Sequence, residues 1–229
     1  MCGIWFSLST SGFAYPSEET SELIRQRGPD SYRVHTTQDK KSQNVYLTFA
    51  SAVLSLRGDH LHAQPLVDEA SGSVLCWNGE AWAISGERVQ GNDTEVVFQL
   101  FLQAARQDAD ADTSVQRLTD AISDVSGPFA FVFYDALHGR VFFSRDCLGR
   151  RSLLHGVDDE GQRMTICSLS DGASFKEVDT HGVYMVDLVD AMSVRMIPWA
   201  DLVSFFTDMY SVRGYITNGV RSRKTLCRQ

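Results

Sequence analysis

The stretch "GPFAFVFYDALHGRVFFSRD", residues 127–146, constrains the fold of this chain more than any other part of the sequence. It contains two aromatic-rich runs on either side of a short segment that includes Gly139. Aromatic and β-branched residues favour strands, and two such runs joined across a glycine-containing turn predict an antiparallel hairpin. We therefore expect antiparallel β structure in the second half of the chain.

Other segments extend this pattern. Strands are predicted over residues 3–9, within 44–56, within 72–82, and near 164–168 and 182–188. Pro16 and Ser17 open a predicted helix that Gly28 and Pro29 end. The element order, with two further helices before the hairpin, favours an α+β fold with mostly antiparallel sheets over a βαβ repeat.

The clearest helix signal follows Asn92, which can cap a helix N-terminus. The apolar stripe at helical spacing comprises Val96, Val97, Leu100, Phe101 and Ala104. A second, weaker helix is predicted over residues 114–125.

Composition and charge narrow the class of protein. With 229 residues, 43% of them hydrophobic, the chain fits one large domain or one domain with an appendage. Its formal net charge of −8 disfavours nucleic acid and anionic membranes as partners. We find neither an apolar run long enough to span a bilayer nor a signal peptide, so we expect a cytoplasmic protein.

Cys2 stands directly behind the initiator methionine. If Met1 is removed, Cys2 carries a thiol and a free α-amine on one residue. An N-terminal amine has an ordinary pKa of about 7.7–8.0 and can act as a general base near neutral pH. The sequence offers no obvious Cys–His pair, so this amine could activate the thiol. Taken alone, the position is equally explained by where translation starts.

The segment "WNGE" supplies candidate donors for the oxyanion that such a nucleophile would create. These donors are the side-chain amide of Asn78 and the backbone N–H of Gly79. Taken alone, Asn-Gly is also typical of a tight turn. Phosphate-binding loops, dinucleotide fingerprints and cysteine-based zinc-ligand spacings do not occur in the sequence. His60 and His62 alternate on an extended segment and could hold a metal, but a polar loop is the favoured interpretation, so no cofactor or metal is predicted.

Together these features resemble the class II glutamine amidotransferase domain of asparagine synthetases, a group of N-terminal-nucleophile hydrolases. The matching stretches follow the order of that family and cover residues 2–190. They are "MCGI", "RQRGPDS" at Arg25–Ser31, "AQPL" at Ala63–Leu66, "WNGE" at Trp77–Glu80, "GNDTEVV" at Gly91–Val97, "GPFAFVFYD" at Gly127–Asp135, "SRDCLGRRSLL" at Ser144–Leu154 and "HGVYMVDL" at His181–Leu188.

The resemblance implies a four-layer αββα sandwich of two antiparallel sheets and hydrolysis of glutamine to glutamate and ammonia. In that reaction Cys2 attacks the side-chain amide, and Asn78 and Gly79 hold the oxyanion. Asp93 matches the acid that binds the substrate's α-ammonium group. Glu80 matches a position that lines the glutamine pocket, although a surface acid in a turn explains it too.

One position departs from the family pattern. Val53 stands where asparagine synthetases carry the arginine that binds the substrate's α-carboxylate. Arg57 lies four residues on, about 13 Å away along an extended strand. Two alternatives follow: Arg57 replaces the missing arginine through a bend or a folded side chain, or glutamine binds poorly.

Asparagine synthetases also contain a second domain, which this sequence is not expected to include. The ATP-pyrophosphatase domain that uses ATP and Mg²⁺ for asparagine biosynthesis is not expected in this sequence, and residues 191–229 are predicted to be a linker or the start of that domain, with a basic tail. The ammonia would then pass to a separate synthetase domain or subunit. The alternative is a non-catalytic interaction module that keeps the amidotransferase fold.

Overall fold

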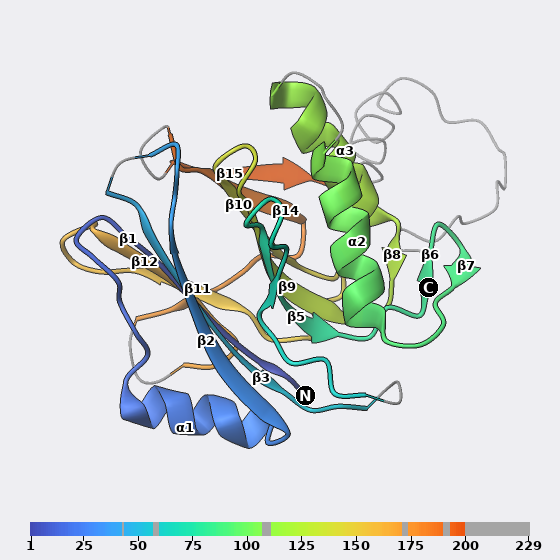
Figure 1. Cartoon of the computed structure of the whole chain (residues 1–229), viewed down its shortest axis with the longest axis horizontal. Coiled ribbons are helices and arrows are strands. Elements are labelled where there is room, and N and C mark those ends of the chain that lie inside the picture. The colour runs from blue at the N-terminus through green and yellow to red at the C-terminus, as the bar shows by residue number, and fades with distance from the viewer. Residues whose placement is uncertain (43, 57–59, 107–110, 171–173, 190–192, 200–229) are drawn as a thin grey trace, which may run out of the picture.

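The computed structural model describes residues 1–42, 44–56, 60–106, 111–170, 174–189 and 193–199. Its helices are α1 (Glu18–Arg27), α2 (Asp93–Arg106) and α3 (Ala111–Ser123). Two six-stranded sheets lie face to face between α1 on one side and α2 with α3 on the other (Figure 1). The predicted α+β fold with a four-layer αββα arrangement is confirmed.

The strands of both large sheets pair antiparallel. Sheet A has the order β13 (Lys176–Glu177), β11 (Leu154–Val157), β12 (Arg163–Cys167), β1 (Gly3–Ser9), β3 (Tyr46–Val53) and β2 (Ser31–Gln38). Sheet B has the order β15 (Ser193–Pro198), β14 (Gly182–Asp187), β10 (Arg140–Arg145), β9 (Phe129–Asp135), β5 (Val74–Gly79) and β4 (Leu66–Val67). A small third sheet has the order β7 (Glu87–Arg88), β6 (Ala83–Ile84) and β8 (Val125–Ser126).

The alternation of strand side chains creates the layers. Along β9, Phe131 and its neighbours two residues away face α2 and α3, whereas Val132 and Tyr134 face sheet A. On sheet A, β1 directs Phe6 into the space between the sheets and Trp5 toward α1. Three hydrophobic cores therefore separate the four layers.

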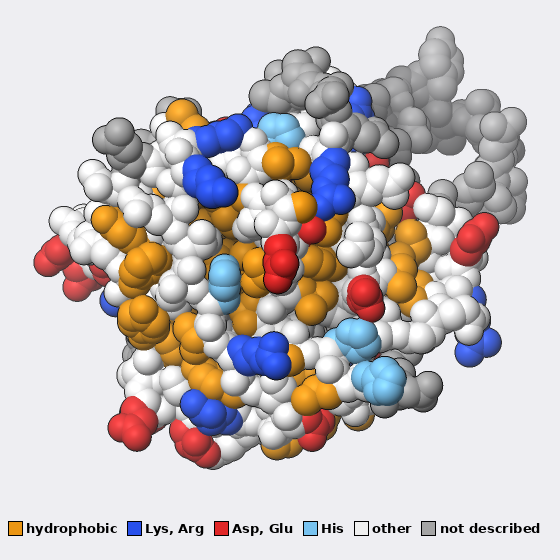
Figure 2. Space-filling model, in the orientation of Figure 1, with side chains coloured by type: hydrophobic (Ala, Val, Ile, Leu, Met, Phe, Trp, Pro, Cys, Tyr) orange, Lys and Arg blue, Asp and Glu red, His pale blue; other side chains and the backbone are white. Residues whose placement is uncertain are grey.

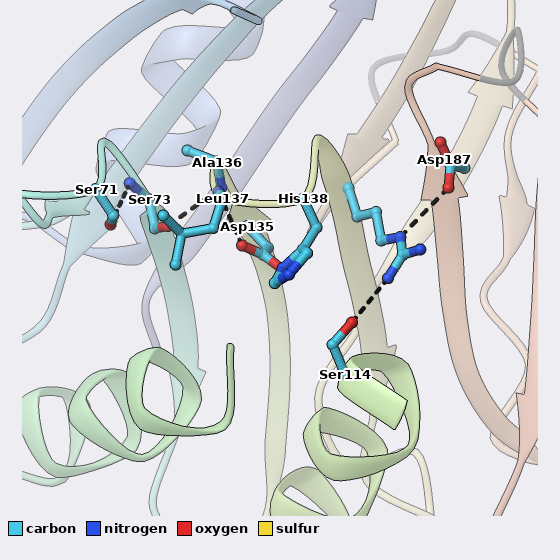
Figure 3. A network of polar contacts seen from close by, with 9 residues as sticks. Ser71, Ser73, Ser114, Asp135, Ala136, Leu137, His138 and Asp187 are labelled. Carbon is cyan, nitrogen blue, oxygen red and sulfur yellow. Dashed lines mark hydrogen bonds and ion pairs between the residues drawn. The ribbon is translucent and has the colours of Figure 1, made fainter. Parts of the chain in front are cut away.

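The β9–β10 hairpin is confirmed, and polar contacts fix its turn (Figure 3). Asp135 accepts a hydrogen bond from the backbone N–H of Leu137 at 3.0 Å and lies 2.7 Å from Nδ1 of His138. Arg140, the first residue of β10, donates to Asp187 of β14 at 3.3 Å and to Ser114 of α3 at 3.0 Å. These bonds set the register of the hairpin against its neighbours.

A polar bond also joins the two sheets across their shared core. The hydroxyl of Tyr134 on β9 donates to Asp39, just beyond the end of β2, at 2.7 Å. Both side chains are buried. Burial, with the hydrogen bond to Asp39, raises the pKa of Tyr134, so the hydroxyl remains a donor at neutral pH.

Helix α1 begins and ends where the sequence predicts. Ser17 caps it by accepting a hydrogen bond from the backbone N–H of Thr20 at 3.1 Å. Ile24 is fully buried against sheet A. Beyond the helix, the backbone N–H of Asp30 donates to the carbonyl of Val53 at 3.1 Å, and its carboxylate accepts from the N–H of Ser55 at 2.8 Å. This segment therefore holds the chain at the end of β3.

The interpretation of Asn78-Gly79 as a tight turn is wrong. Both residues belong to β5, where Asn78 pairs with Ala130 and Gly79 with Phe129 of β9. The stripe predicted for α2 also shifts. Val96 is 38% exposed, whereas Val97 and Phe101 are buried with three of their neighbours, Phe98, Leu102 and Ala105. Asn78 and Gly79 are extended because β5 pairs with β9, about 50 residues away. The buried residues of α2 are those on the side of the helix that packs in the core.

Strand β15 and Trp199 lie beyond residue 190, where the sequence predicts that the domain ends. Strand β15 pairs with β14 along its whole length, and the indole N–H of Trp199 donates to the carbonyl of Thr180 at 2.7 Å. The division at residue 190 stays a prediction, and the basic tail lies outside the described residues. Among the described residues, no helix combines the length and apolar character needed to cross a bilayer.

We predict that Phe131→Ala destabilises the protein strongly. Phe131 is fully buried, and its ring centroid lies 5.2 Å from that of Phe101 and 6.4 Å from that of Trp77. Removing the ring should lower the free energy of unfolding by about 3–5 kcal/mol, measured by chemical denaturation. Leu137→Ala, at the partly exposed turn of the same hairpin, should change it by less than about 0.5 kcal/mol. A loss below about 1 kcal/mol for Phe131→Ala would contradict this packing.

Candidate active site

A pocket opens at one end of the sandwich, where β3 and β5 end and α2 begins. Cys2, Asn78, Gly79, Glu80 and Asp93 all line it, so the structure brings these predicted site residues together. Arg57 lies outside the described residues. On the face of the molecule that Figure 2 shows, in the orientation of Figure 1, acidic and basic side chains are interspersed with hydrophobic ones.

Cys2 immediately precedes β1 and is held through its backbone. Its carbonyl accepts a hydrogen bond from Nε of Arg27 at 3.3 Å, and Nη1 of Arg27 donates to the carbonyl of Ser168 at 3.4 Å. The adjacent Gly3 admits α1, because a Cβ there would lie 2.8 Å from Cγ2 of Ile24. Arg27 thus holds the Cys2 carbonyl, and Gly3 leaves room for α1 beside it.

The thiol of Cys2 lies within the pocket, 3.9 Å from the carbonyl oxygen of Leu54. Burial raises the pKa of this thiol and the nearby carboxylate of Asp93 acts in the same direction, whereas the charges of the N-terminus and Arg151 act in the opposite direction. The neutral thiol therefore predominates at neutral pH while Met1 is in place. A nucleophilic Cys2 needs a base close by.

Asn78 presents an unused donor to the pocket. Its side chain is 1% exposed, and the amide nitrogen Nδ2 has no hydrogen-bond partner among the described residues. A buried donor without a partner costs about 1–3 kcal/mol, so such groups are rare unless a ligand completes them. The pocket is thus prepared to receive an acceptor oxygen at Asn78.

Gly79 follows at the end of β5, where no side chain fits. A Cβ at this position would lie 2.8 Å from Cβ of Phe129 and 2.9 Å from Cε2 of Trp77. The close approach of these aromatic groups requires glycine. Backbone rather than side chain therefore borders the pocket beside Asn78.

Asp93 is the first residue of α2 and joins the helix to the end of β5. Its Oδ2 accepts hydrogen bonds from Nε1 of Trp77 at 3.1 Å and from the backbone N–H of Ala81 at 2.8 Å. The carboxylate is 5% exposed and also benefits from the positive end of the helix dipole. A negative charge is thereby fixed at the pocket wall, with Oδ1 taking part in neither bond.

Glu80 and Arg151 form an ion pair across the pocket. Oε1 of Glu80 lies 3.6 Å from Nη2 of Arg151, which comes from the loop after β10. Reasoning from the sequence did not single out Arg151 among the site residues. Its only signal was its place in "SRDCLGRRSLL", where it follows another arginine.

Val53, where the sequence departs from the family pattern, and Gln64 also line the pocket. Val53 lines the pocket at the end of β3 and is 5% exposed, so an apolar side chain does occupy that wall. Gln64, also missed from the sequence, accepts a hydrogen bond from the backbone N–H of Trp77 through Oε1 at 2.6 Å. Within the described part of the chain, no group of three or more His, Cys, Asp or Glu side chains is arranged to hold a metal ion.

Comparison with known proteins identifies the family. The sequence model of the glutamine amidotransferase domain matches residues 1–209. The chain belongs to the glutamine amidotransferase domain family. This amidotransferase domain is 31% identical over 212 residues to asparagine synthetase domain-containing protein 1 of Bos taurus, covering 87% of this chain and 31% of that protein.

Asparagine synthetase B (glutamine-hydrolyzing) of Escherichia coli is also 31% identical, over 175 residues that cover 71% of this amidotransferase chain and 28% of the relative. The chain therefore spans about a third of the length of these relatives.

Solved structures support the fold. Glutamine phosphoribosylpyrophosphate amidotransferase of B. subtilis superposes on 84% of this amidotransferase chain with a TM-score of 0.56 at 15% identity, covering 49% of that structure. A structure described as the allosteric regulatory enzyme of purine biosynthesis gives a TM-score of 0.58 at 16% identity, covering 84% and 48%. These likenesses support the fold of two facing antiparallel sheets between helical layers.

We predict that the thiol of Cys2 reacts slowly at neutral pH when Met1 is retained. Burial raises its pKa above the ordinary 9.0, so the reactive thiolate forms only in alkaline solution. Alkylation by iodoacetamide, followed by mass spectrometry from about pH 6 to about pH 10, should still be accelerating at the upper end. Cys76, which is fully buried, should remain unmodified in the folded protein. A rate that levels off below about pH 8 would contradict the effect of burial.

Proposed function

We propose that this chain hydrolyses glutamine to glutamate and ammonia, with Cys2 as the nucleophile after removal of Met1. The observation that carries the proposal is the presence, in one pocket, of the Cys2 thiol and the buried Nδ2 of Asn78, which has no partner among the described residues. A thiol nucleophile and a ready oxyanion donor are the two groups that acyl transfer from an amide requires. Membership of the glutamine amidotransferase domain family supports glutamine as that amide.

The first half of the reaction forms a thioester. The α-amine of the processed Cys2 takes the thiol proton, and the sulfur attacks the side-chain carbonyl carbon of glutamine. The carbonyl oxygen becomes an oxyanion that accepts hydrogen bonds from Asn78 and from the backbone N–H of Gly79. When the tetrahedral intermediate collapses, the carbon–nitrogen bond breaks and the amine returns its proton to the departing ammonia.

The second half releases glutamate. Water attacks the γ-glutamyl thioester, with the α-amine again accepting a proton, and the same donors hold the second oxyanion. The sulfur leaves as a thiol after it regains the proton. While Met1 is attached, the nitrogen of Cys2 is part of a peptide bond and is not basic, so removal of Met1 is a precondition of both steps.

The charged groups of the pocket suit the amino-acid end of the substrate. Asp93 and Glu80 can receive the α-ammonium group, because both carboxylates line the pocket. The assignment of the α-carboxylate to Arg57 remains a prediction, since that residue lies outside the described part of the chain. Glutamine itself supplies the reacting amide, and the proposal requires neither a metal ion nor a nucleotide.

The ammonia would serve a synthetase-type domain. Relatives named asparagine synthetase or asparagine synthetase domain-containing protein are about three times as long as the matched region. We assign to such a domain or partner the ATP- and Mg²⁺-dependent step of asparagine biosynthesis, and to this chain the supply of nitrogen, in the cytoplasm.

We predict that Cys2→Ala abolishes glutamate release from glutamine, because it removes the nucleophile. Glutamate is measured in a coupled assay on protein whose native N-terminus has been defined by mass spectrometry. Cys76→Ala, which changes a cysteine whose side chain faces the core between the sheets, should keep its activity. Retained Met1 in active protein, or glutamate release unaffected by Cys2→Ala, would overturn the proposed function.

We predict that Asn78→Ala lowers kcat by about 10²–10³-fold, the usual effect of losing one oxyanion donor. The free energy of unfolding should change by less than about 1 kcal/mol, because Nδ2 makes no hydrogen bond to any described residue that would be lost. Gln103→Ala, which removes an exposed amide on α2, is the matched control. Wild-type turnover by Asn78→Ala would show that Asn78 does not hold the oxyanion.

A further inference from the structure

The fixed charges of the pocket are unevenly matched to a zwitterionic substrate. Among the described residues that line it, Glu80 and Asp93 carry negative charge and Arg151 is the single arginine. The α-carboxylate of glutamine would enter this partly desolvated pocket and requires a cation, because an unpaired charge there loses its hydration without compensation. Val53 provides no charge at its wall. Arg151 is thus the described side chain whose permanent charge fits the carboxylate.

The guanidinium of Arg151 is close to the pocket but only weakly engaged. Its Nη2 lies 3.6 Å from Oε1 of Glu80, longer than a charge-assisted hydrogen bond of about 2.7–2.9 Å. Its Nη1 lies 3.6 Å from Sδ of Met1, and a thioether is a weak acceptor. Nε is buried and has no partner among the described residues. Several donors of Arg151 therefore remain available to a stronger acceptor.

The backbone that carries Arg151 is firmly placed, in contrast to its loosely engaged head group. Asp146, at the start of the loop, accepts hydrogen bonds from the N–H of Leu148 and of Arg150 at 3.1 Å each, and from Nε of Arg150 at 2.9 Å. On the other side, the hydroxyl of Ser152 donates to the carbonyl of Ser168 at 2.6 Å. Arg151 is therefore presented from a fixed position.

Removal of Met1 links this arginine to maturation of the nucleophile. The same cleavage that would free the α-amine of Cys2 also takes away the thioether beside Nη1 of Arg151. The processed pocket then contains both the catalytic amine and an arginine with an additional free donor. Substrate binding and chemistry would be enabled together.

Neighbouring cations are less suited to the role. Arg27 is bound to the backbone carbonyls of Cys2 and Ser168, and Arg150 is bound to Asp146. His62 lines the pocket but faces Glu95 at 3.7 Å, and a histidine is cationic only when protonated. Arg151 alone among these residues combines a place in the pocket with uncommitted donors and a permanent charge.

We propose that Arg151 binds the α-carboxylate of glutamine, taking the place of a cation at Val53. This inference rests on the proposed function, because it assumes glutamine as the ligand of the pocket. Arg151 moves from its long contact with Glu80 to the carboxylate, and Glu80 is left to face the substrate's α-ammonium group. The ion pair of the free protein is exchanged for two ion pairs with the zwitterion. Arg151 thereby selects amides that carry a carboxylate at the far end of the molecule.

The test compares three ligands that differ only at the amino-acid end. Glutamine carries both charged groups, glutaramate lacks the α-ammonium group, and 4-aminobutanamide lacks the α-carboxylate. Each ligand is titrated by NMR into the Cys2→Ala protein, which can bind the ligand but cannot form a thioester with it. The same titrations are repeated with the double variant that also carries Arg151→Gln. Arg151→Lys tests retention of charge, Arg88→Ala removes an exposed arginine as a control, and Arg57→Ala tests the alternative residue.

We expect Arg151→Gln to weaken glutamine and glutaramate by about 10–100-fold and to leave 4-aminobutanamide within about twofold. Arg151→Lys should recover part of the loss, and Arg88→Ala should cause none. Equal loss for all three ligands, a carboxylate-selective loss with Arg57→Ala instead of Arg151→Gln, or failure of glutamine to bind Cys2→Ala would each overturn the inference.

Binding and turnover separate the two proposals. Carboxylate-selective loss with Arg151→Gln, combined with no glutamate release by the processed wild-type protein, would overturn hydrolysis and keep Arg151 as the carboxylate-binding residue. Glutamate release by the wild type, with glutamine binding unchanged in Arg151→Gln, would overturn the role of Arg151 and leave the proposed function intact.

Discussion

The burial of the central strands on both faces determines where polar chemistry can occur in this protein. Every residue of β1 and of β9 is buried, because each strand packs against the opposite sheet on one face and a helical layer on the other. Polar side chains within such strands would need partners inside an apolar core. The functional groups instead gather where strands begin or end. Cys2 precedes β1, Asn78 lies near the end of β5, and Asp93 opens α2.

This arrangement imposes opposing demands on the site. The same burial that orders Cys2 raises the pKa of its thiol, and Nδ2 of the buried Asn78 has no hydrogen-bond partner among the residues that the structure describes. The buried amide reduces the stability of the empty pocket, whereas the raised thiol pKa costs stability only in alkaline solution, above the ordinary pKa of a thiol. Both become useful when a base and an acceptor oxygen arrive, since a desolvated donor interacts more strongly than a hydrated one. Under the proposed function, the pocket thus keeps its strongest interactions for the reacting substrate.

Local sequence patterns predicted the elements that depend on neighbouring residues. The hairpin, the Ser17 cap and the start of α2 after Asn92 all follow from side chains within one or two turns of the element. The mistaken turn at Asn78 and Gly79 shows the limit of such patterns. Their strand geometry comes from pairing with β9, which a short window of sequence does not contain. The edge strands β2 and β15 were missed for the same reason, because their mixed polar sequences become strands through their neighbours.

Arg151 was missed for a different reason. In sequence it is one of two adjacent arginines in a loop, a pattern typical of a solvated surface. Its neighbour Arg150 turns to Asp146, and only the folded loop places Arg151 opposite Glu80. The positions Cys2, Asn78, Gly79, Glu80 and Asp93 could be proposed from the sequence because they lie in short motifs with a known order. A residue that supplies charge from a separate loop is not identified by such a short motif.

Cys2 directly precedes a strand of sheet A, whereas Asn78 lies in a strand of sheet B, and this division gives the intersheet core a second role. A shift of one sheet along the other would leave each sheet intact and yet change the separation of thiol and amide, and displacements of about 1 Å can cost about 100-fold in rate. The bond between Tyr134 and Asp39 crosses from sheet B to sheet A and opposes that sliding. The alignment of the proposed nucleophile and the proposed oxyanion donor therefore depends on the resistance of the whole sandwich to shear, controlled in part by residues at the end remote from the pocket.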